Sequence, residues 1–214
     1  MPSALDLSRV PQFLREGEEE MRKAREARAA PEIQARIAAR LAMLSVETGR
    51  YADAMVWAVT LLNVTERFRN PGLRVSTLSF IAALYNDVHQ HEAAVRALRE
   101  VLALQPERPE AWFNLANALG DLKRPVEALE AARKAVALRP GSGAYRVRLG
   151  ALLWDCESAA AGRAEIRIGA WMLDEAGLTT RFDRMWRWIA ARMLEDAEAV
   201  ARVEPLLFPK DTIH

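Results

Sequence analysis

Apolar side chains recur along this chain with the spacing of an α-helix. Between residues 109 and 120 they fall within a narrow arc at about 100° per residue and form one packing stripe. The stripe consists of Trp112, Leu115, Ala116 and Leu119. No segment alternates as a half-buried strand would, so we expect paired helices. The first members are expected over residues 35–47, 74–87, 109–120 and 143–156, and the second members over 51–65, 91–104, 125–138 and 159–173.

The stripe returns after 34 residues. If Pro109 is position 1 of a unit, the stripe occupies positions 4, 7, 8 and 11. In the unit that begins at Val75, these positions hold Leu78, Ile81, Ala82 and Tyr85. A weaker copy begins at Gly143 and an earlier one at Ala35, which is followed by an inserted turn signal, Asn70-Pro71-Gly72. A period of this length is typical of repeat proteins.

This pattern resembles the tetratricopeptide repeat, which has Trp, Leu, Gly and Tyr or Leu in its first helix, small residues in its second and a closing Pro. Ala116 stands where the family prefers Gly, and Ala132 where it prefers Phe. The resemblance implies an all-α fold, a right-handed α-solenoid of helix-turn-helix repeats with N- and C-terminal capping helices. One helix pair cannot bury its own stripe, so neighbouring pairs must stack.

We expect three parts in the chain. A charged N-terminal helix with a thin apolar stripe (Leu14, Met21 and Ala24) forms a helical cap within residues 1–34. Four repeats follow within residues 35–174, as units 35–68, 75–108, 109–142 and 143–176. Residues 177–214 form either a degenerate fifth repeat or C-terminal capping helices.

The resemblance also implies a binding site, because the arc opposite the packing stripe lines a concave groove in this family. The groove candidates are Arg40, Met43, Glu47, Phe80, Asn86, Phe113, Asn114, Asn117, Arg148 and Trp154. Apolar anchors among amides and a few charges suit a peptide or helix of a partner protein. The alternative is that Phe80, Phe113 and Trp154 are buried against a neighbouring helix or the C-terminal segment.

A second candidate surface lies on the helix near residues 181–193. Three arginines flank one aromatic ring there: Arg181, Arg184 and Arg192 around Trp188. Such a ring could stack on a base or face a protein partner. Interleaved acidic residues argue against nucleic acid, so this helix is expected to act as a cap or as a surface for self-association.

Composition narrows the class of protein. Half of the 214 residues are apolar and 28% are charged, which excludes a disordered chain. The formal net charge of +1 gives no field that favours nucleic acid or anionic lipid. We expect neither a membrane span nor a secretion signal, and the single Cys156 suits a reducing compartment, so a cytoplasmic location is expected. The excess of Arg over Lys is associated with bacterial genomes.

Signals for chemistry are weak. His89 and His91 lie in a turn near Asp87, but this spacing without a cysteine cluster is nonspecific, and no metal is expected. Cys156 has no neighbouring His to activate it. We therefore expect no catalytic residues and no cofactor. The sequence predicts a non-catalytic adaptor that binds another protein. The alternatives are a chaperone for secreted or assembled subunits, as in type III secretion, and a scaffold that self-assembles as a homo-oligomer.

Overall fold

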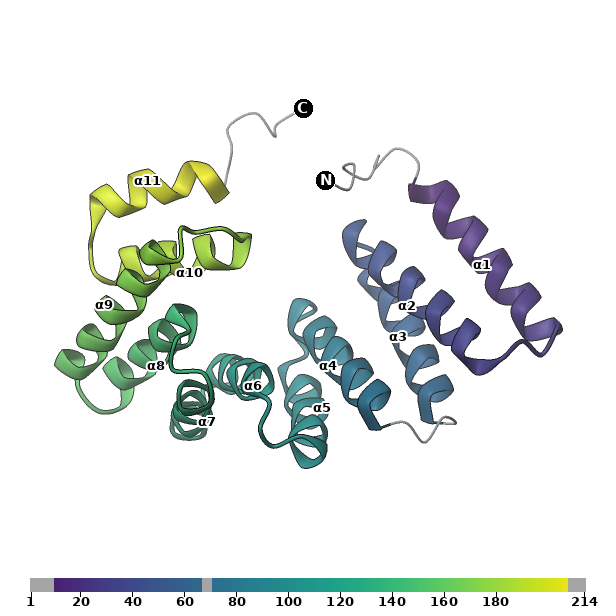
Figure 1. Ribbon diagram of the computed structural model, residues 1–214, viewed down its shortest axis with the longest axis horizontal. Helices are drawn as coiled ribbons and strands as arrows, with labels where there is room; N and C mark the ends of the chain where they lie inside the picture. The colour runs from purple at the N-terminus through teal and green to yellow at the C-terminus, as the bar shows by residue number, and fades with distance from the viewer. Residues whose placement is uncertain (1–9, 67–70, 208–214) are drawn as a thin grey trace. The chain divides into compact units, whose positions relative to one another are not determined.

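The computed structural model describes residues 10–66 and 71–207. Within these ranges the chain forms eleven α-helices and no strand (Figure 1). The helices are α1 (Val10–Glu26), α2 (Pro31–Glu47), α3 (Tyr51–Glu66), α4 (Pro71–Asp87), α5 (His91–Leu104), α6 (Pro109–Asp121), α7 (Pro125–Leu138), α8 (Gly143–Cys156), α9 (Ala159–Glu175), α10 (Arg181–Met193) and α11 (Ala197–Leu207). The expectation of an all-α helical repeat fold is confirmed.

Local chemistry explains where these helices begin and end. Proline occupies the first turn of α6 and α7, where its missing N–H costs nothing. The turn inside each of three repeats closes with a residue in the left-handed region, namely Gly49 (φ 70°), His89 (φ 58°) and Lys123 (φ 58°). Only Gly49 adopts this conformation without steric cost. The helix bounds agree closely with those expected from the spacing of apolar residues.

The helices form two compact units, which divide after Pro106. In the first unit, α1 packs on α2, α2 on α3, α3 on α4, and α4 on α5. The thin stripe of α1 is buried, with Leu14 and Met21 only 2% and 1% exposed. A Cβ at Gly17 would lie 2.6 Å from Leu41 Cδ2, so this glycine lets α1 approach α2 closely. The N-terminal helix therefore packs directly on the first repeat.

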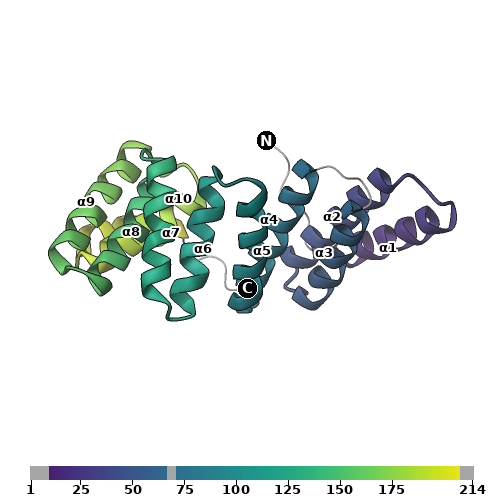
Figure 2. The same ribbon diagram turned by 90° about the horizontal axis from the view of Figure 1, so that it is seen from below.

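The second unit contains α6 to α11, and its tightest pair is α8 with α9. Each helix carries two glycines that face glycines of the other. A Cβ at Gly150 would lie 2.7 Å from the carbonyl oxygen of Gly162, and one at Gly143 would lie 2.5 Å from that of Gly169. Figure 2 shows α6 and α7 of this unit as a similar side-by-side pair. After α9 the chain returns as α10, which contacts both α8 and α9.

Candidate functional site

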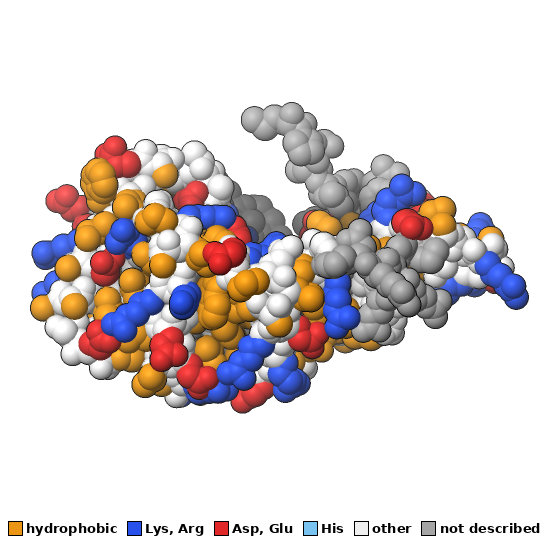
Figure 3. Space-filling model, turned by 60° about the horizontal axis from the view of Figure 1, so that its bottom comes forward, with side chains coloured by type: hydrophobic (Ala, Val, Ile, Leu, Met, Phe, Trp, Pro, Cys, Tyr) orange, Lys and Arg blue, Asp and Glu red, His pale blue; other side chains and the backbone are white. Residues whose placement is uncertain are grey.

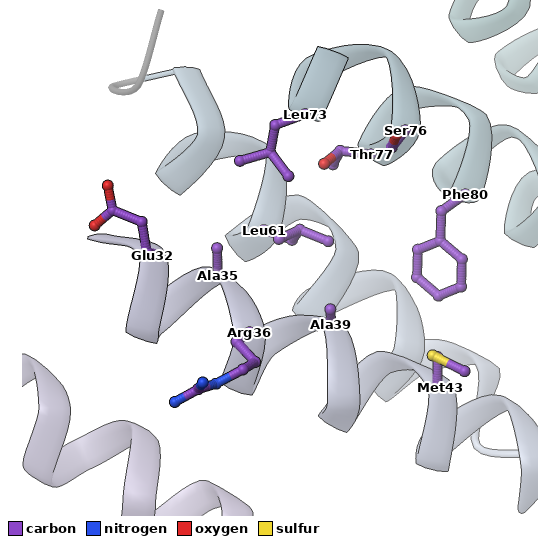
Figure 4. Close-up of a pocket in the computed structure, with 10 residues that line it drawn as sticks. All are labelled: Glu32, Ala35, Arg36, Ala39, Met43, Leu61, Leu73, Ser76, Thr77 and Phe80. Carbon is purple, nitrogen blue, oxygen red and sulfur yellow. The ribbon is translucent and has the colours of Figure 1, made fainter. Parts of the chain in front are cut away.

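An apolar hollow lies between α2 and α4 in the first unit, with α3 beneath it (Figure 4). Its volume is about 440 Å³, within the range of about 300–1,000 Å³ that is typical of ligand pockets. Ten residues line it: Glu32, Ala35, Arg36, Ala39, Met43, Leu61, Leu73, Ser76, Thr77 and Phe80. Because α2 and α4 are the first helices of consecutive repeats, the hollow lies where the family resemblance implies a groove.

The edge and the base of the hollow differ in how far their side chains are exposed. From α2, Met43 projects with 56% of its surface exposed. From α4, the Phe80 ring extends toward Met43 at one end of the hollow, as Figure 4 shows. The floor is Leu61, which is only 5% exposed, and Thr77 beside it is 3% exposed. The hollow therefore combines a packed base with an exposed, flexible thioether that can adapt to a ligand.

Only two of the five groove candidates in this unit line the hollow, Met43 and Phe80. Arg40 instead forms an exposed ion pair with Glu20 of α1. Glu47 is exposed at the end of α2, and the Asn86 carboxamide oxygen lies 3.4 Å from His91 Nδ1. The structure does not bring these three residues into the site.

The hollow also contains residues that sequence reasoning missed. Arg36 and Ala39 lie at positions 2 and 5 of the first unit, which belong to the groove arc, so the repeat pattern contained the signal for both. Leu61 lies at position 27, where the pattern has a small residue. Nothing in the pattern indicated that this position would form the floor of a hollow.

In the second unit, the expected groove is covered by α10. Phe113 is 3% exposed, and its ring stacks on Tyr145 at a centroid distance of 4.6 Å. The Trp186 ring of α10 meets Phe113 edge-on at 5.3 Å. Trp154 packs against the same cluster as Ile189 of α10. Phe113 and Trp154 therefore pack against the C-terminal segment, as the alternative stated in the sequence analysis expects. They do not line an open groove.

Arg148 is held by the end of helix α6. Its Nη2 donates a hydrogen bond to the Ala116 carbonyl oxygen at 2.9 Å and lies 3.4 Å from that of Asn117. A Cβ at Gly120 would lie 1.9 Å from this nitrogen, so the guanidinium fits only beside a glycine. Burial lowers the pKa of Arg148. Arg148 thus adds a side-chain donor to carbonyls within α6 and ties α8 to that helix, with the predicted Asn114 and Asn117 half-buried on α6.

The arginines of α10 are mostly engaged with their own unit. Arg192 lies over the Trp188 ring at 5.7 Å, and Arg184 Nε donates to the Leu178 carbonyl oxygen at 3.0 Å, while Arg181 is exposed. The sequence analysis missed Arg187, which is only 5% exposed and donates from Nε to the Asp174 carboxylate at 3.0 Å. This pair anchors α10 to α9.

The described residues show no sign of metal or nucleophile chemistry. Among them, no group of three or more His, Cys, Asp or Glu side chains could hold a metal ion. Burial raises the pKa of the Cys156 thiol, and Asp155 and Glu157 raise it further, which is the opposite of an activated nucleophile. None of the described helices has the length and apolar character needed to cross a bilayer.

Charges are mixed over the face shown in Figure 3, where acidic and basic side chains are interspersed with apolar ones. This agrees with the formal net charge of +1. That face lacks the basic field that attracts a phosphate backbone.

The helical repeats and the apolar hollow between first helices define a protein-interaction scaffold. A family model of the tetratricopeptide repeat matches residues 83–143. Residues 83–143 are therefore similar in sequence to tetratricopeptide repeats, and the described helices on either side continue the all-α helical-repeat fold. No curated protein matches it significantly.

Several solved structures share the fold. BtubC from P. vanneervenii is 17% identical with a TM-score of 0.69, and the match covers 99% of this chain and 94% of that one. A kinesin light chain repeat protein of Podospora anserina is 15% identical with a TM-score of 0.68, covering 80% and 90%. MamA from Desulfovibrio magneticus is 16% identical with a TM-score of 0.57, covering 78% and 97%. At these identities the likeness shows the fold alone.

Proposed function

We propose that the protein is a non-catalytic adaptor that binds a segment of a partner protein in the hollow between α2 and α4. The observation that carries the proposal is the apolar volume of about 440 Å³, with Met43 56% exposed at its edge. Filling it would remove a contiguous apolar surface from water, which is the main source of affinity at protein interfaces.

The length of the hollow supports a polypeptide ligand. Its lining runs along α2 from Glu32 to Met43, which corresponds to about 16 Å at a rise of 1.5 Å per residue. Charged side chains, Glu32 and Arg36, occur only at one end, so the remainder can receive apolar side chains from a continuous segment. A polar edge around an apolar centre is the usual composition of a protein interface.

A library of displayed random peptides selected on the full chain tests this function. We expect Met43→Asp to weaken the selected peptides by more than about tenfold, because a buried unpaired carboxylate is costly. Val56→Asp on α3 is the matched control, since Val56 is 62% exposed and does not line the hollow. Equal losses for both variants, or none for Met43→Asp, would refute the proposal.

Narrower forms of this function follow from the same site. A chaperone for secreted or assembled subunits would use the hollow to hold an apolar segment of its client. The excess of Arg over Lys and the single Cys156 favour a bacterial, cytoplasmic setting. Deleting the gene in the native host and following the solubility of co-purifying proteins distinguishes a chaperone from a simple adaptor.

Self-association is a second candidate function. Its support is on α9, where Ile168 and Trp171 lie one turn apart and are 40% and 60% exposed. Exposed apolar pairs of this kind are common at interfaces between copies of a chain. Light scattering over a dilution series tests it: a molar mass that stays at the monomer value throughout excludes this candidate.

A further inference from the structure

The two units contain the same site in two states. In the second unit, a cluster of buried residues consists of Phe113, Ala135, Ala144 and Tyr145, with Trp186 packed against it. By repeat position, these four residues correspond to Ala39, Leu61, Ser76 and Thr77 of the first unit. All four counterparts line the hollow between α2 and α4. The hollow is therefore the counterpart of the place where α10 seats Trp186.

The residues that differ explain why one site is filled and the other is open. The second unit has two aromatic rings, Phe113 and Tyr145, where the first has the small Ala39 and Thr77. The second unit also has α10, whose Phe182 and Trp186 both contact the Phe113 ring, at 5.8 and 5.3 Å between ring centroids. Among the described residues of the first unit, no helix takes the place of α10. The first unit therefore lacks both the lining rings of the second unit and the rings that α10 supplies.

We propose that the hollow receives a helix of a partner protein that presents two aromatic side chains one turn apart, as α10 presents Phe182 and Trp186. The inference rests on the proposed function and specifies the partner. The chain itself shows that the counterpart of the hollow in the second unit accepts such a helix. In the hollow, Ala39 and Thr77 leave more room for rings than Phe113 and Tyr145 do, while Leu61 and Ser76 are larger than Ala135 and Ala144. Met43 and Phe80 supply a thioether and an aromatic edge, which are favourable neighbours for aromatic rings.

The test uses the full chain and a synthetic peptide with the sequence of residues 178–196, which contains α10. We expect saturable binding of the fluorescent peptide at one site. A peptide with Phe182→Ala and Trp186→Ala should bind more than about tenfold more weakly, since aromatic anchors dominate helix-in-groove binding. Equal affinity of the two peptides would overturn the proposal, as would absence of binding.

A chain variant locates the site. Ala39→Phe combined with Thr77→Tyr gives the first unit the ring pair of the second and fills the hollow. We expect this variant to lose peptide affinity by more than about tenfold while its helicity is retained. Ala103→Phe is the matched control, because Ala103 is exposed on α5 and does not line the hollow.

Each other outcome is informative. If the peptide binds the filled variant and the native chain equally, it binds elsewhere, for example by displacing α10, and the proposal fails. If peptides from the random library depend on Met43 but lack paired aromatic residues, the proposed function stands and this inference falls. If the native chain dimerises and the peptide dissociates the dimer, the occupant is a second copy, which also contradicts a separate partner.

Discussion

At the scale of single residues, glycines determine how closely the helices of the second unit approach. A Cβ at Gly162 would lie 2.6 Å from both the Gly150 carbonyl oxygen and the Trp154 backbone nitrogen. Both are backbone atoms, which cannot rotate away as the end of a side chain can. The separation of α8 and α9 therefore depends on the absence of a side chain at this position.

We expect Gly162→Ala to lower the free energy of unfolding by about 1–3 kcal/mol, the usual cost of inserting a methyl group into a packed interior. Urea denaturation followed by circular dichroism measures the change. Gly141→Ala is the control, because nothing lies within 4 Å of a Cβ built there. A loss of stability in the control as large as that in Gly162→Ala would show that the helix contact is not the cause.

Cys156 provides a pH-dependent prediction. Its pKa is raised by burial and by the neighbouring Asp155 and Glu157, so the reactive thiolate forms only at higher pH than in a free cysteine. We expect iodoacetamide to alkylate Cys156 more slowly than a model thiol at pH 8, with the rate rising as the pH increases. A rate at pH 8 equal to that of glutathione would contradict the raised pKa.

From the sequence, the repeat pattern indicates which positions lie on the groove arc, but it does not indicate contacts that are particular to this chain. The repeat pattern led to Met43 and Phe80, which line the hollow. Arg148 was placed in a groove, but it donates to the Ala116 carbonyl oxygen. That contact requires Gly120 on α6. No spacing rule of the repeat connects this glycine with Arg148.

At the scale of elements, α10 is the helix that covers the groove of the second unit. Thr180 and Asp183 form a capping box at its start: the Thr180 hydroxyl accepts from the Asp183 N–H at 3.0 Å, and the Asp183 carboxylate accepts from the Thr180 N–H at 3.1 Å. The box satisfies two N–H groups that the helix cannot pair internally. It thus fixes where α10 begins, one residue before Phe182.

Removing this cap should loosen α10. We expect Thr180→Ala to cost about 1 kcal/mol, the typical loss for an N-cap threonine, and to speed amide exchange in the first turn of α10. Urea denaturation and hydrogen exchange measure the two effects. Thr179→Ala is the matched control. The Thr179 hydroxyl lies 3.5 Å from Asp183 Oδ2, which is too far for a strong hydrogen bond. Identical results for both variants would argue against the capping role.

The helix bounds were predictable, whereas the docking of α10 was not. Proline at helix starts and the regular apolar stripe defined the bounds of α6 and α7 from local signals. The aromatic residues Phe113 and Trp186 are 73 positions apart in the chain. An aromatic residue on the groove arc gives the same sequence signal whether its ring packs on a helix of the same chain or on another protein. The sequence therefore left both alternatives open.

At the scale of the whole molecule, the balance of charge shapes how a partner would be recognised. The chain carries 30 basic and 29 acidic side chains, and the hollow is lined mainly by apolar residues. Long-range steering by charge is therefore weak, and affinity would arise from the removal of apolar surface from water.

This balance gives a thermodynamic prediction. We expect binding of the α10 peptide to change by less than about twofold between about 0.05 and 0.5 M salt, because exposed charges are screened over this range and apolar contacts are not. Calorimetry should also show a negative heat capacity change on binding. A tenfold loss of affinity at the higher salt concentration would indicate that charges carry the interaction.

The paired glycines of α8 and α9 also restrict how this protein can vary among organisms. A codon change from glycine to alanine at residue 150 or 162 adds a methyl group that collides with a backbone carbonyl oxygen of the facing helix. Each of the two codons is therefore restricted to glycine independently of the other. The contact between α8 and α9 should accordingly diverge more slowly than the outer surface of this helix pair.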